Sequence, residues 1–555
     1  MECTCIPHTR LPKSSPLFLD YLYHFDRVSQ FYNGPPFEAA SYAAVAAGLE
    51  SFRTPRAELA TVLARQNQAL GCGEATLDNI GRLSEPGTFA VVTGQQVGLF
   101  SGPAFTLYKA LTAICLAQSL SAQGLRSVPV FWLATEDHDL EEVAQVATLD
   151  EEYELIELED QGVRPAPRCS VGRVTLSAQI GSSLDRLEKA LDAGAARDQL
   201  LQDLRASYQP GVSWGRAFGL FVTKLFSRWG VIMVDALDES LHRLSAPTYE
   251  RAIDAAPELR ARLLARSHEL IVAGYHAQVH VGEDSTLLFL SRDGNRTALR
   301  QEGGHFTLDG SGELERLSLE DLRSWLKDHP GDFSANALLR PVVQDTLLPT
   351  LAYVAGPSEL AYHGQAQTLY SSFGRPQPVI FPRASFTLID SRTRRLLEKY
   401  HVGVEDVWQG EEHLARKIAA AGFAEGWSER LDQSEGDLTQ LLERLRKDIE
   451  TIDPTLLETL KHVEEKMRYQ MERLKGKITR AALERSDLLT RHQQALLRLV
   501  MPRRDLQERE VSGAYFLGRA GYELLDRILS QIHAPGVARE PRPPCRSSDH
   551  QVLTY

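Results

Sequence analysis

The stretch FAVVTGQQVGLFSGPAFTLYKALTAICLAQSLSAQGLRSVPVFWLA, residues 89–134, decides the fold class. Its opening FAVVTG is an apolar, β-branched run that predicts a buried strand, and SVPVFWLA at its end predicts a second strand. Between them Leu107, Leu111 and Ile114 recur at helical spacing. A strand, a helix and a strand in this order make the βαβ unit of a parallel sheet, so we expect an α/β protein.

Further apolar runs extend the predicted sheet. GVIMVDA (230–236) and LPTLAYVAG (348–356) each predict a strand, and QPVIFPRASFTLID (377–390) predicts another that carries a basic residue. The run at 348–356 repeats the opening pattern, because a Gly-Pro turn and a helical segment follow it. Both strand-to-helix turns would lie at the carboxyl edge of the sheet, where open α/β sheets bind ligands, and we expect the site between them.

The pattern divides the chain into four parts. Residues 1–88 predict a helical leader packed on the core, and 89–400 predict the core itself, with insertions at about 151–210 and 274–330. The second insertion alternates around Asp293-Gly294 and Gly303-Gly304 turns and predicts an antiparallel patch. The segment EDHDLEEVAQVA after the second strand predicts a loop that becomes helical. Residues 401–535 predict a helical domain, and 536–555 a tail whose HQVLTY docks as a last strand.

Leucines and charges dominate residues 437–500. Leu456, Leu460, Val463 and Met467 follow steps of four, three and four, the a/d seam of a coiled coil. Pro454 separates this helix from a preceding one. The seam is compatible with an antiparallel hairpin, with a dimerising coil, or with a helix packed on its own domain.

Composition narrows the function classes. The formal net charge of −13 argues against a general nucleic-acid binder, since phosphate neutralisation needs a basic surface. No run of about 18 or more apolar residues predicts a membrane span, so we expect a cytoplasmic protein. The six cysteines form no C-x-x-C pair, which favours reduced, structural thiols over a zinc ribbon or a disulfide framework.

The first candidate binding segment is the glycine-spaced turn after residue 93. Gly94, Gly98 and Gly102 fit neither the Walker pattern nor the G-x-G-x-x-G fingerprint. The turn nevertheless opens a helix, whose unsatisfied N–H groups attract anions. Polar side chains that could add hydrogen bonds or charge are those of Thr93, Gln95, Gln96 and Lys109. We expect ligand binding here, with a purely structural turn as the alternative.

The second candidate is TEDHD, residues 135–139, which directly follows a predicted strand. Glu136, Asp137, His138 and Asp139 crowd ionisable groups at the sheet edge, and such a histidine can act as a general base or a metal ligand. The alternative is a helix N-terminus bearing acids, which the helix dipole favours.

The third candidate set surrounds the second strand-to-helix turn. Glu359 and Tyr362 fall on one face if the helix starts at Pro357, and Arg383 follows a strand, where it can bind a carboxylate or phosphate. The other members are Arg340, Gln344 and Gly356. For each of these residues alone, a surface or buttressing role is the simpler interpretation. Because all of them lie near strand ends that converge, the set favours a ligand-binding site.

Several long motifs resemble the cysteine ligase family of bacillithiol biosynthesis. These are VVTGQQVGLFSGPAFTLYKA (91–110), PVFWLATEDHDLEEV (129–143), RPVVQDTLLPTLAYVAGPSELAYHGQ (340–365) and FPRASFTLID (381–390). The likeness runs from SPLFLDYLYHF (15–25) to HQVLTY (550–555).

The resemblance implies a Rossmann-like core with connecting insertions, similar to class I aminoacyl-tRNA synthetases, and a coiled-coil domain used to form a homodimer. It also implies that the carboxyl of cysteine is joined to the amine of glucosaminyl malate. In such synthetases a histidine-rich turn holds ATP, and the matching turn here, 93–109, carries no histidine pair.

From this family chemistry we assign expected roles. ATP with Mg²⁺ would activate the carboxyl group, and no tightly bound metal is expected. The loop 94–102 and Lys109 would bind phosphate or carboxylate, His138 with Asp137 or Asp139 would remove the amine proton, and Arg340 and Arg383 would bind acidic groups. Two rival hypotheses remain: a metal-dependent phosphoester hydrolase built on EDHD, and a non-catalytic coiled-coil assembly protein.

Overall fold

A five-stranded parallel sheet forms the core of the computed structural model, which describes residues 3–163, 168–292, 294–309, 314–422, 427–484, 486–535 and 548–555. Its strands are β2 (Phe89–Gln95), β3 (Ser127–Leu133), β6 (Ile232–Asp235), β12 (Thr350–Ala355) and β13 (Val379–Pro382). They lie in the order β13-β12-β2-β3-β6, and every neighbouring pair is parallel. The predicted α/β class is therefore confirmed.

The strand order reverses between β2 and β12. The chain passes from β2 outward to β3 and β6 and then returns to the other side of β2 to form β12 and β13. This is the Rossmann order, in which ligands bind in the crevice at the carboxyl ends of the two strands that flank the reversal. The fold thus places a binding crevice where the two strand-to-helix turns meet.

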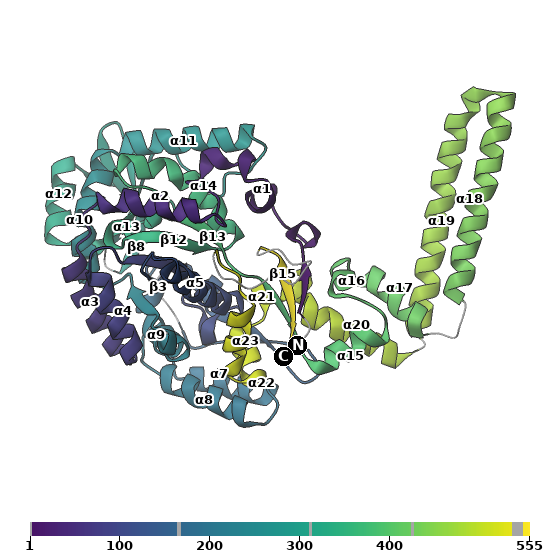
Figure 1. Cartoon of the computed structure of the whole chain (residues 1–555), viewed down its shortest axis with the longest axis horizontal. Helices are drawn as coiled ribbons and strands as arrows, with labels where there is room; N and C mark the ends of the chain where they lie inside the picture. Colours follow the sequence, from purple (N-terminus) through teal and green to yellow (C-terminus); the bar gives the residue numbers. More distant parts are fainter. Residues whose placement is uncertain are drawn as a thin grey trace.

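Both faces of the sheet are covered, as the apolar strands predict. Val91 packs with α5 (Phe105–Ala122), which links β2 to β3, whereas Val92 belongs to a separate apolar cluster that contains Leu360 of α14 (Pro357–Ser372). Helices α1 (Pro16–Tyr23), α2 (Ala39–Glu50), α3 (Arg56–Ala69), α4 (Glu74–Ser84), α9 (Trp214–Phe226), α10 (Glu239–Asp254), α11 (Ala256–Val272) and α13 (Arg340–Leu347) surround this core (Figure 1).

The predicted antiparallel insertion is present. Its strands are β7 (Ser285–Arg292), β8 (Asn295–Glu302), β9 (His305–Asp309), β10 (Leu314–Leu317) and β11 (Phe333–Ala335), in the order β10-β9-β8-β7-β11, with α12 (Leu319–Asp328) beside them. Gly303 and Gly304 turn between β8 and β9 with φ of 54° and 86°. Of the other predicted turn, Asp293 lies outside the described residues.

The segment after TEDHD departs from the helical expectation. Only one turn, α6 (Leu140–Val143), is helical, and β4 (Gln145–Leu149) follows and pairs with β5 (Leu155–Glu159). Val146 and Leu149 are buried, so pairing and burial in a hairpin outweigh the local helical pattern. Helices α7 (Ile180–Ala190) and α8 (Ala195–Ser207) complete this region.

A second small sheet joins the two ends of the described chain. The stretch 377–390 forms two strands rather than one, since the chain leaves the main sheet after β13 and re-forms as β14 (Phe386–Ile389). β15 (His550–Thr554) pairs parallel to β14 and antiparallel to β1 (Cys3–Ile6). HQVLTY therefore docks as a strand, as predicted. Cys5 is disulfide-bonded, so the expectation of reduced thiols is wrong at this position.

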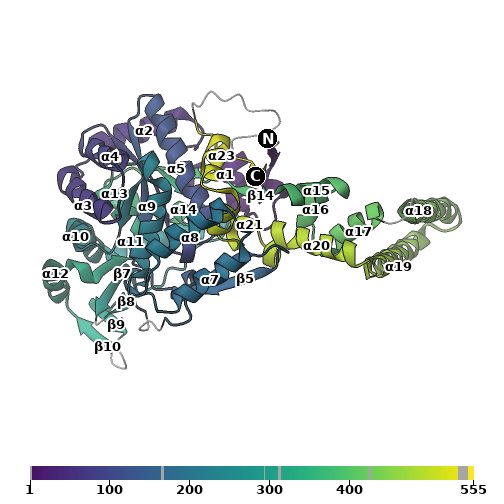
Figure 2. The same ribbon diagram turned by 90° about the horizontal axis from the view of Figure 1, so that it is seen from below.

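A helical arm projects from the core (Figures 1 and 2). α15 (Ser391–Lys399), α16 (Val404–Trp408), α17 (Glu411–Gly422) and α20 (Asp487–Val500) form its base, and α18 (Trp427–Ile452) with α19 (Leu457–Glu484) forms the hairpin. Arg446 of α18 pairs with Glu464 of α19 at 2.9 Å. The antiparallel hairpin is thus present. Helix α19 also packs against α17 and α20 of the base, where Arg416 pairs with Glu472 at 3.0 Å, so the alternative of a helix packed on its own domain applies to part of α19 as well.

The chain then returns to the core through α21 (Gln507–Glu510), α22 (Gly513–Ala520) and α23 (Glu523–Gln531). The amide of Ala104 donates to the carbonyl of Val511 at 2.9 Å, and that of Gly513 donates to Gly102 at 3.1 Å. No helix in the described part of the chain is long and apolar enough to cross a bilayer.

Two buried histidines make the small sheet sensitive to acid. Burial lowers the pKa of His8 to about 4 and that of His550 to about 3, from an ordinary 6.5. The unfolded chain therefore binds protons below pH 6.5 that the folded chain does not, and stability falls as pH decreases. At pH 5.5 each histidine should cost about 1.4 kcal/mol.

Thermal unfolding at pH 7.5 and 5.5 measures this effect. His550→Asn should reduce the loss of stability between the two pH values, whereas the matched change at the exposed His305 should leave it unaltered. An equal pH dependence in the wild type and His550→Asn would contradict the assignment.

Candidate functional site

A cavity of about 710 Å³ lies at the carboxyl ends of β2, β3 and β12, beneath residues of the antiparallel insertion. All the predicted binding segments contribute to it, although they span residues 94 to 383. The predicted residues that line it are Gly94, Gln95, Gln96, Lys109, Glu136, Asp137, His138, Arg340, Gly356, Glu359, Tyr362 and Arg383. The edge of the sheet thus brings together side chains from three segments that are far apart in the sequence.

Two glycines of the predicted anion loop have a structural role instead. A Cβ on Gly98 would lie 2.7 Å from the Cα of Gly102, and Gly102 has a φ of +68° that side chains disfavour. The helix that follows begins against Val511 and Gly513, which bond to this loop. Gly98 and Gly102 do not line the cavity. Their close approach and the positive φ of Gly102 fit a tight structural turn, the alternative to an anion-binding loop.

Three more predicted residues support the cavity from outside its lining. Thr93 is buried, and its hydroxyl donates to the carbonyl of Val354 at 3.0 Å, which ties β2 to β12. Asp139 caps α6 by accepting from the amide of Glu142 at 3.1 Å, the role of an acid at a helix start. Gln344 is buried and accepts from Arg340 at 3.0 Å.

Lys109 and Glu359 form an ion pair on the cavity wall. Lys109 Nζ lies 2.5 Å from Glu359 Oε2 and is 3.1 Å from Gln95 Oε1, and it also donates to the carbonyl of Gly94. Burial lowers the pKa of the Lys109 ammonium, and the Glu359 carboxylate opposes that shift. Glu359 in turn accepts from the amide of Gly356 at 2.8 Å, so it also caps α14.

Arg340 is held by aromatic hydroxyls. Its guanidinium donates to Tyr362 Oη at 3.0 Å, and Tyr353 Oη donates to Glu359 Oε1 at 2.7 Å. These contacts join the start of α13 to β12 and α14. The guanidinium therefore has a fixed position on the cavity wall, as recognition of a carboxylate or phosphate requires.

The acids of TEDHD have separate surroundings. Asp137 accepts from the Gln96 amide at 2.8 Å through Oδ2 and from the backbone amide of His138 at 2.8 Å through Oδ1. Glu136 lies 3.5 Å from Nε2 of the buried His242. Burial raises the pKa of the Glu136 carboxyl, and His242 and Arg296 oppose the rise. The two adjacent carboxylates therefore have different surroundings.

His138 contacts an arginine that was not predicted. Arg296 of β8 is 3.1 Å from His138 Nδ1, and because a guanidinium only donates, Nδ1 accepts and the proton of a neutral ring is assigned to Nε2. Burial and the charge of Arg296 lower the pKa of His138, which favours the neutral ring. His138 thus presents a donor to the cavity, and its role as a base stays a prediction that requires this contact to break.

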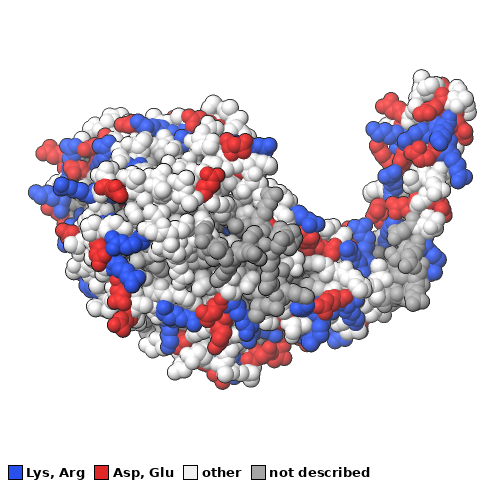
Figure 3. Space-filling model, viewed as in Figure 1, with Lys and Arg blue, Asp and Glu red and all other residues white. Residues whose placement is uncertain are grey.

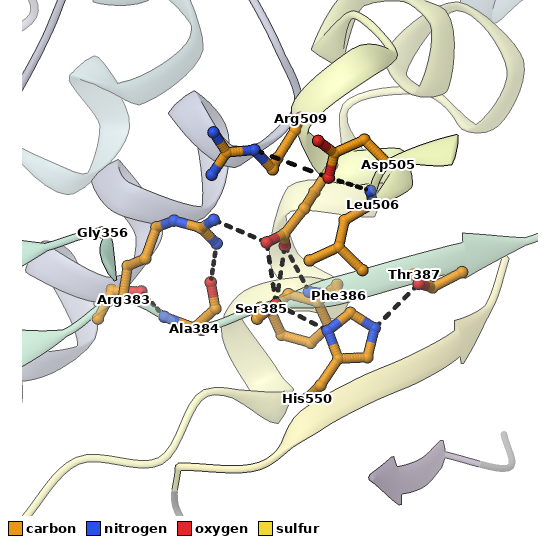
Figure 4. A network of polar contacts seen from close by, with 12 residues as sticks. Gly356, Arg383, Ala384, Ser385, Phe386, Thr387, Asp505, Leu506, Arg509 and His550 are labelled. Atoms are coloured by element: carbon orange, nitrogen blue, oxygen red, sulfur yellow. Dashed lines mark hydrogen bonds and ion pairs between the residues drawn. The ribbon is translucent and has the colours of Figure 1, made fainter. Parts of the chain in front are cut away.

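Arg383 lines the cavity and is paired with a carboxylate from the C-terminal helices (Figure 4). Its guanidinium donates to Glu508 at 2.7 Å, and both side chains are almost fully buried. Glu508 also accepts from the Ser385 hydroxyl and the Phe386 amide, each at 3.0 Å. Although burial opposes it, Arg383 keeps the pKa of Glu508 below its usual value.

Sequence reasoning missed the lining residues outside the predicted segments. Arg296 and Phe289 come from the insertion, and Arg509 comes from α21. A single arginine in an alternating strand gives no local signal of a site. Its contact with His138 depends on how the insertion folds over the sheet edge.

The described residues contain no group of three or more His, Cys, Asp or Glu side chains arranged to hold a metal ion. The EDHD side chains instead contact separate partners: Glu136 faces His242, Asp137 contacts Gln96, and Asp139 caps a helix. The arrangement does not favour the metal-dependent hydrolase.

Two family models match the chain. The bacillithiol biosynthesis BshC N-terminal Rossmann-like domain matches residues 1–384, and the BshC C-terminal coiled-coil domain matches residues 386–537. The chain belongs to the BshC family. Its Rossmann-like core and coiled coil are those of this family, as the motifs indicated.

Several relatives are named "Putative cysteine ligase BshC". One from Koribacter versatilis is 37% identical, covering 97% of this chain and 98% of its own length. One from Solibacter usitatus is 36% identical, covering 96% and 98%, and one from Salinibacter ruber is 34% identical, covering 96% and 97%.

Among the solved structures that match is the crystal structure of a putative arginyl-tRNA synthetase from Campylobacter jejuni. The match covers 87% of this chain and 99% of the synthetase chain, with 9% sequence identity and a TM-score of 0.24.

The Arg383–Glu508 pair predicts a large loss of stability in one variant. Glu508→Ala leaves a buried guanidinium without its carboxylate and should cost about 3–5 kcal/mol of unfolding free energy. Glu510→Ala, two residues away, removes only a partly exposed contact to Arg503 and should cost less than about 1 kcal/mol. Denaturant unfolding compares the two, and equal midpoints would show that the buried pair contributes nothing.

Proposed function

We propose that this chain is an ATP-dependent ligase that joins the carboxyl of cysteine to the amine of glucosaminyl malate. The observation that carries the proposal is convergence: motifs shared with the family, from residues 94 to 383, meet at one cavity in the crevice of the reversed strand order. Family membership over nearly the whole chain supports the same activity.

The charges of the cavity suit these substrates. Glucosaminyl malate has two carboxylates and one amine, and cysteine has one of each. Arg340 and Arg509 supply cationic groups, whereas Glu136, Asp137 and Glu142 supply anionic groups from one segment after β3. Because Arg383 is already paired with Glu508, Arg340 is the better candidate to bind a malate carboxylate.

ATP with Mg²⁺ remains part of the proposal. When bound, it supplies the activation that amide formation requires. Ser358 at the start of α14 would contact its phosphates, since it lines the cavity at the N-terminus of a 16-residue helix, whereas Lys109 and the Gly356 amide are already paired with Glu359. A cytoplasmic location, where ATP and free thiols are abundant, belongs to the same proposal.

A reconstitution assay tests the activity. Purified protein with cysteine, glucosaminyl malate and ATP with magnesium should form a product with the mass of bacillithiol, together with AMP or ADP. Omission of cysteine should abolish both product and nucleotide cleavage. Phosphate release without cysteine would favour the hydrolase, and absence of product with folded protein would favour the assembly role.

We also propose that the arm forms a homodimer. Leu441 and Leu445 of α18 are 50% and 42% exposed at helical spacing of four, and Val463 and Met467 of α19 are each 41% exposed at the same spacing. The hairpin buries Leu442 and Leu460 but leaves these apolar positions open. On the face of the arm that Figure 3 shows, Lys and Arg are mixed with Asp and Glu, so that face has no single sign of charge that would repel a second copy.

Leu441→Glu combined with Met467→Glu should convert the dimer to a monomer, because both place charge on the apolar face. Sedimentation velocity or light scattering measures the mass. Gln440→Glu with Lys466→Glu, at neighbouring exposed positions, is the matched control and should remain dimeric. A wild-type chain that sediments as a monomer at micromolar concentration would overturn the dimer proposal.

A further inference from the structure

Behind the cavity wall lies a small recess lined by polar atoms that lack a hydrogen-bond partner. Trp132, Glu136 and His242 line this recess of about 10 Å³, roughly enough for one water molecule. Among the described residues, Trp132 Nε1, Glu136 Oε1 and both ring nitrogens of His242 lack a hydrogen bond. Buried polar groups are almost always hydrogen-bonded to protein or to ordered water, and the recess has room for a water molecule beside these atoms.

Glu136 connects the recess to the large cavity, since it lines both. Its Oε1 lies 3.5 Å from Nε2 of His242, which is only 3% exposed, while the Glu136 side chain retains 13% exposure. The exposed part of the Glu136 side chain therefore faces the large cavity, with the buried Oε1 and the imidazole behind it.

The other titratable groups of the same segment are already engaged. Both carboxylate oxygens of Asp137 accept hydrogen bonds, from Gln96 and from the His138 amide. His138 Nδ1 accepts from Arg296. Glu136 also lines the cavity, and neither oxygen of its carboxylate is used within TEDHD, although the unbonded Oε1 is buried on the side of His242.

Charged groups from four elements face Glu136. His242 and Tyr249 come from α10, Asp235 from β6, Arg296 from β8 and Arg340 from α13. Burial and Asp235 raise the pKa of the Glu136 carboxyl, and the imidazole and the two guanidinium groups oppose the rise. Glu136 is thereby more basic than an exposed glutamate, which favours proton removal by its carboxylate.

We propose that Glu136 is the proton acceptor for the amine that is acylated and that His242 is its positioning residue. This inference rests on the proposed ligase function. The ammonium of the sugar substrate would bind the Glu136 carboxylate, because Glu136 lines the cavity and its side chain is not used in hydrogen bonds within TEDHD.

Amide formation moves two protons and replaces a carbon–oxygen bond with a carbon–nitrogen bond. One N–H proton of the ammonium passes to Glu136, and the freed lone pair forms a bond to the carbonyl carbon of the cysteine carboxyl, activated as a mixed anhydride with phosphate. The bond from that carbon to the phosphate oxygen breaks, and its electron pair leaves with the phosphate. The leaving phosphate takes the second N–H proton, which yields the neutral amide.

The test is the pH dependence of kcat/KM for glucosaminyl malate. In the wild type the rate should rise with pH as Glu136 loses its proton. Glu136→Gln should lower kcat/KM by about 10²–10⁴-fold and remove that inflection. Glu141→Gln, the same change at an exposed helical position, should retain both the rate and the profile.

His242→Asn tests the positioning role. Because the His242 charge opposes the rise in the Glu136 pKa, its removal should move the acid-side inflection to higher pH. A structural role alone would change the amount of folded protein without moving the inflection. Circular dichroism and thermal unfolding establish that each variant is folded before its profile is measured.

Two outcomes would overturn the inference: an acid-side inflection that persists in Glu136→Gln, or an effect confined to KM for cysteine. A binding measurement separates this failure from failure of the ligase proposal. By calorimetry the wild type should prefer glucosaminyl malate over its N-acetyl derivative by at least about tenfold, and Glu136→Gln should lose that preference.

If the wild type forms no amide product, the ligase proposal fails, and the calorimetric result alone decides whether Glu136 binds the amine. If the wild type is active and Glu136→Gln retains full activity, the ligase proposal holds and the role of Glu136 is rejected.

Discussion

The contact between Lys109 and Glu359 joins the two halves of the sheet where the strand order reverses. Lys109 belongs to the helix after β2, and Glu359 to the helix after β12. The same ammonium contacts Gly94 at the end of β2, and the same carboxylate caps α14. A buried ion pair is strongly unfavourable when one partner is lost, so the crevice keeps its form only while both helices stay in register. The other cavity groups are positioned around this contact.

The second constraint is that side chains of the same charge have different contacts in the folded protein. Glu136 and Asp137 are adjacent in sequence, yet one faces a buried imidazole and the other accepts two hydrogen bonds. Arg340 lies among tyrosine hydroxyls, whereas Arg383 is neutralised by Glu508. Side chains of the same charge therefore differ in whether they are already paired. The fold, rather than the motif, decides which of them can contact a substrate.

Much of the fold could be predicted because its signals are local. Continuous apolar runs such as those of β2 and β12 fit a sheet buried on both faces, and turns at their carboxyl ends predict a shared edge. The roles of Gly98 and Gly102 could not be predicted, since glycine spacing alone does not distinguish an anion loop from a close backbone approach. Arg296 and Glu508 were missed because they reach the site from an insertion and from the last helices, through contacts that leave no periodic pattern.

The pairing of Arg383 with Glu508 has a consequence for synthesis on the ribosome. The two residues are 125 positions apart, and the helical arm lies between them. At about 5–20 residues per second, Arg383 emerges roughly 6–25 seconds before its carboxylate exists. During that interval the parallel sheet can form while its edge still carries an uncompensated cation, so the cavity is completed only after the arm has been made. The order of translation thus separates folding of the core from assembly of the site.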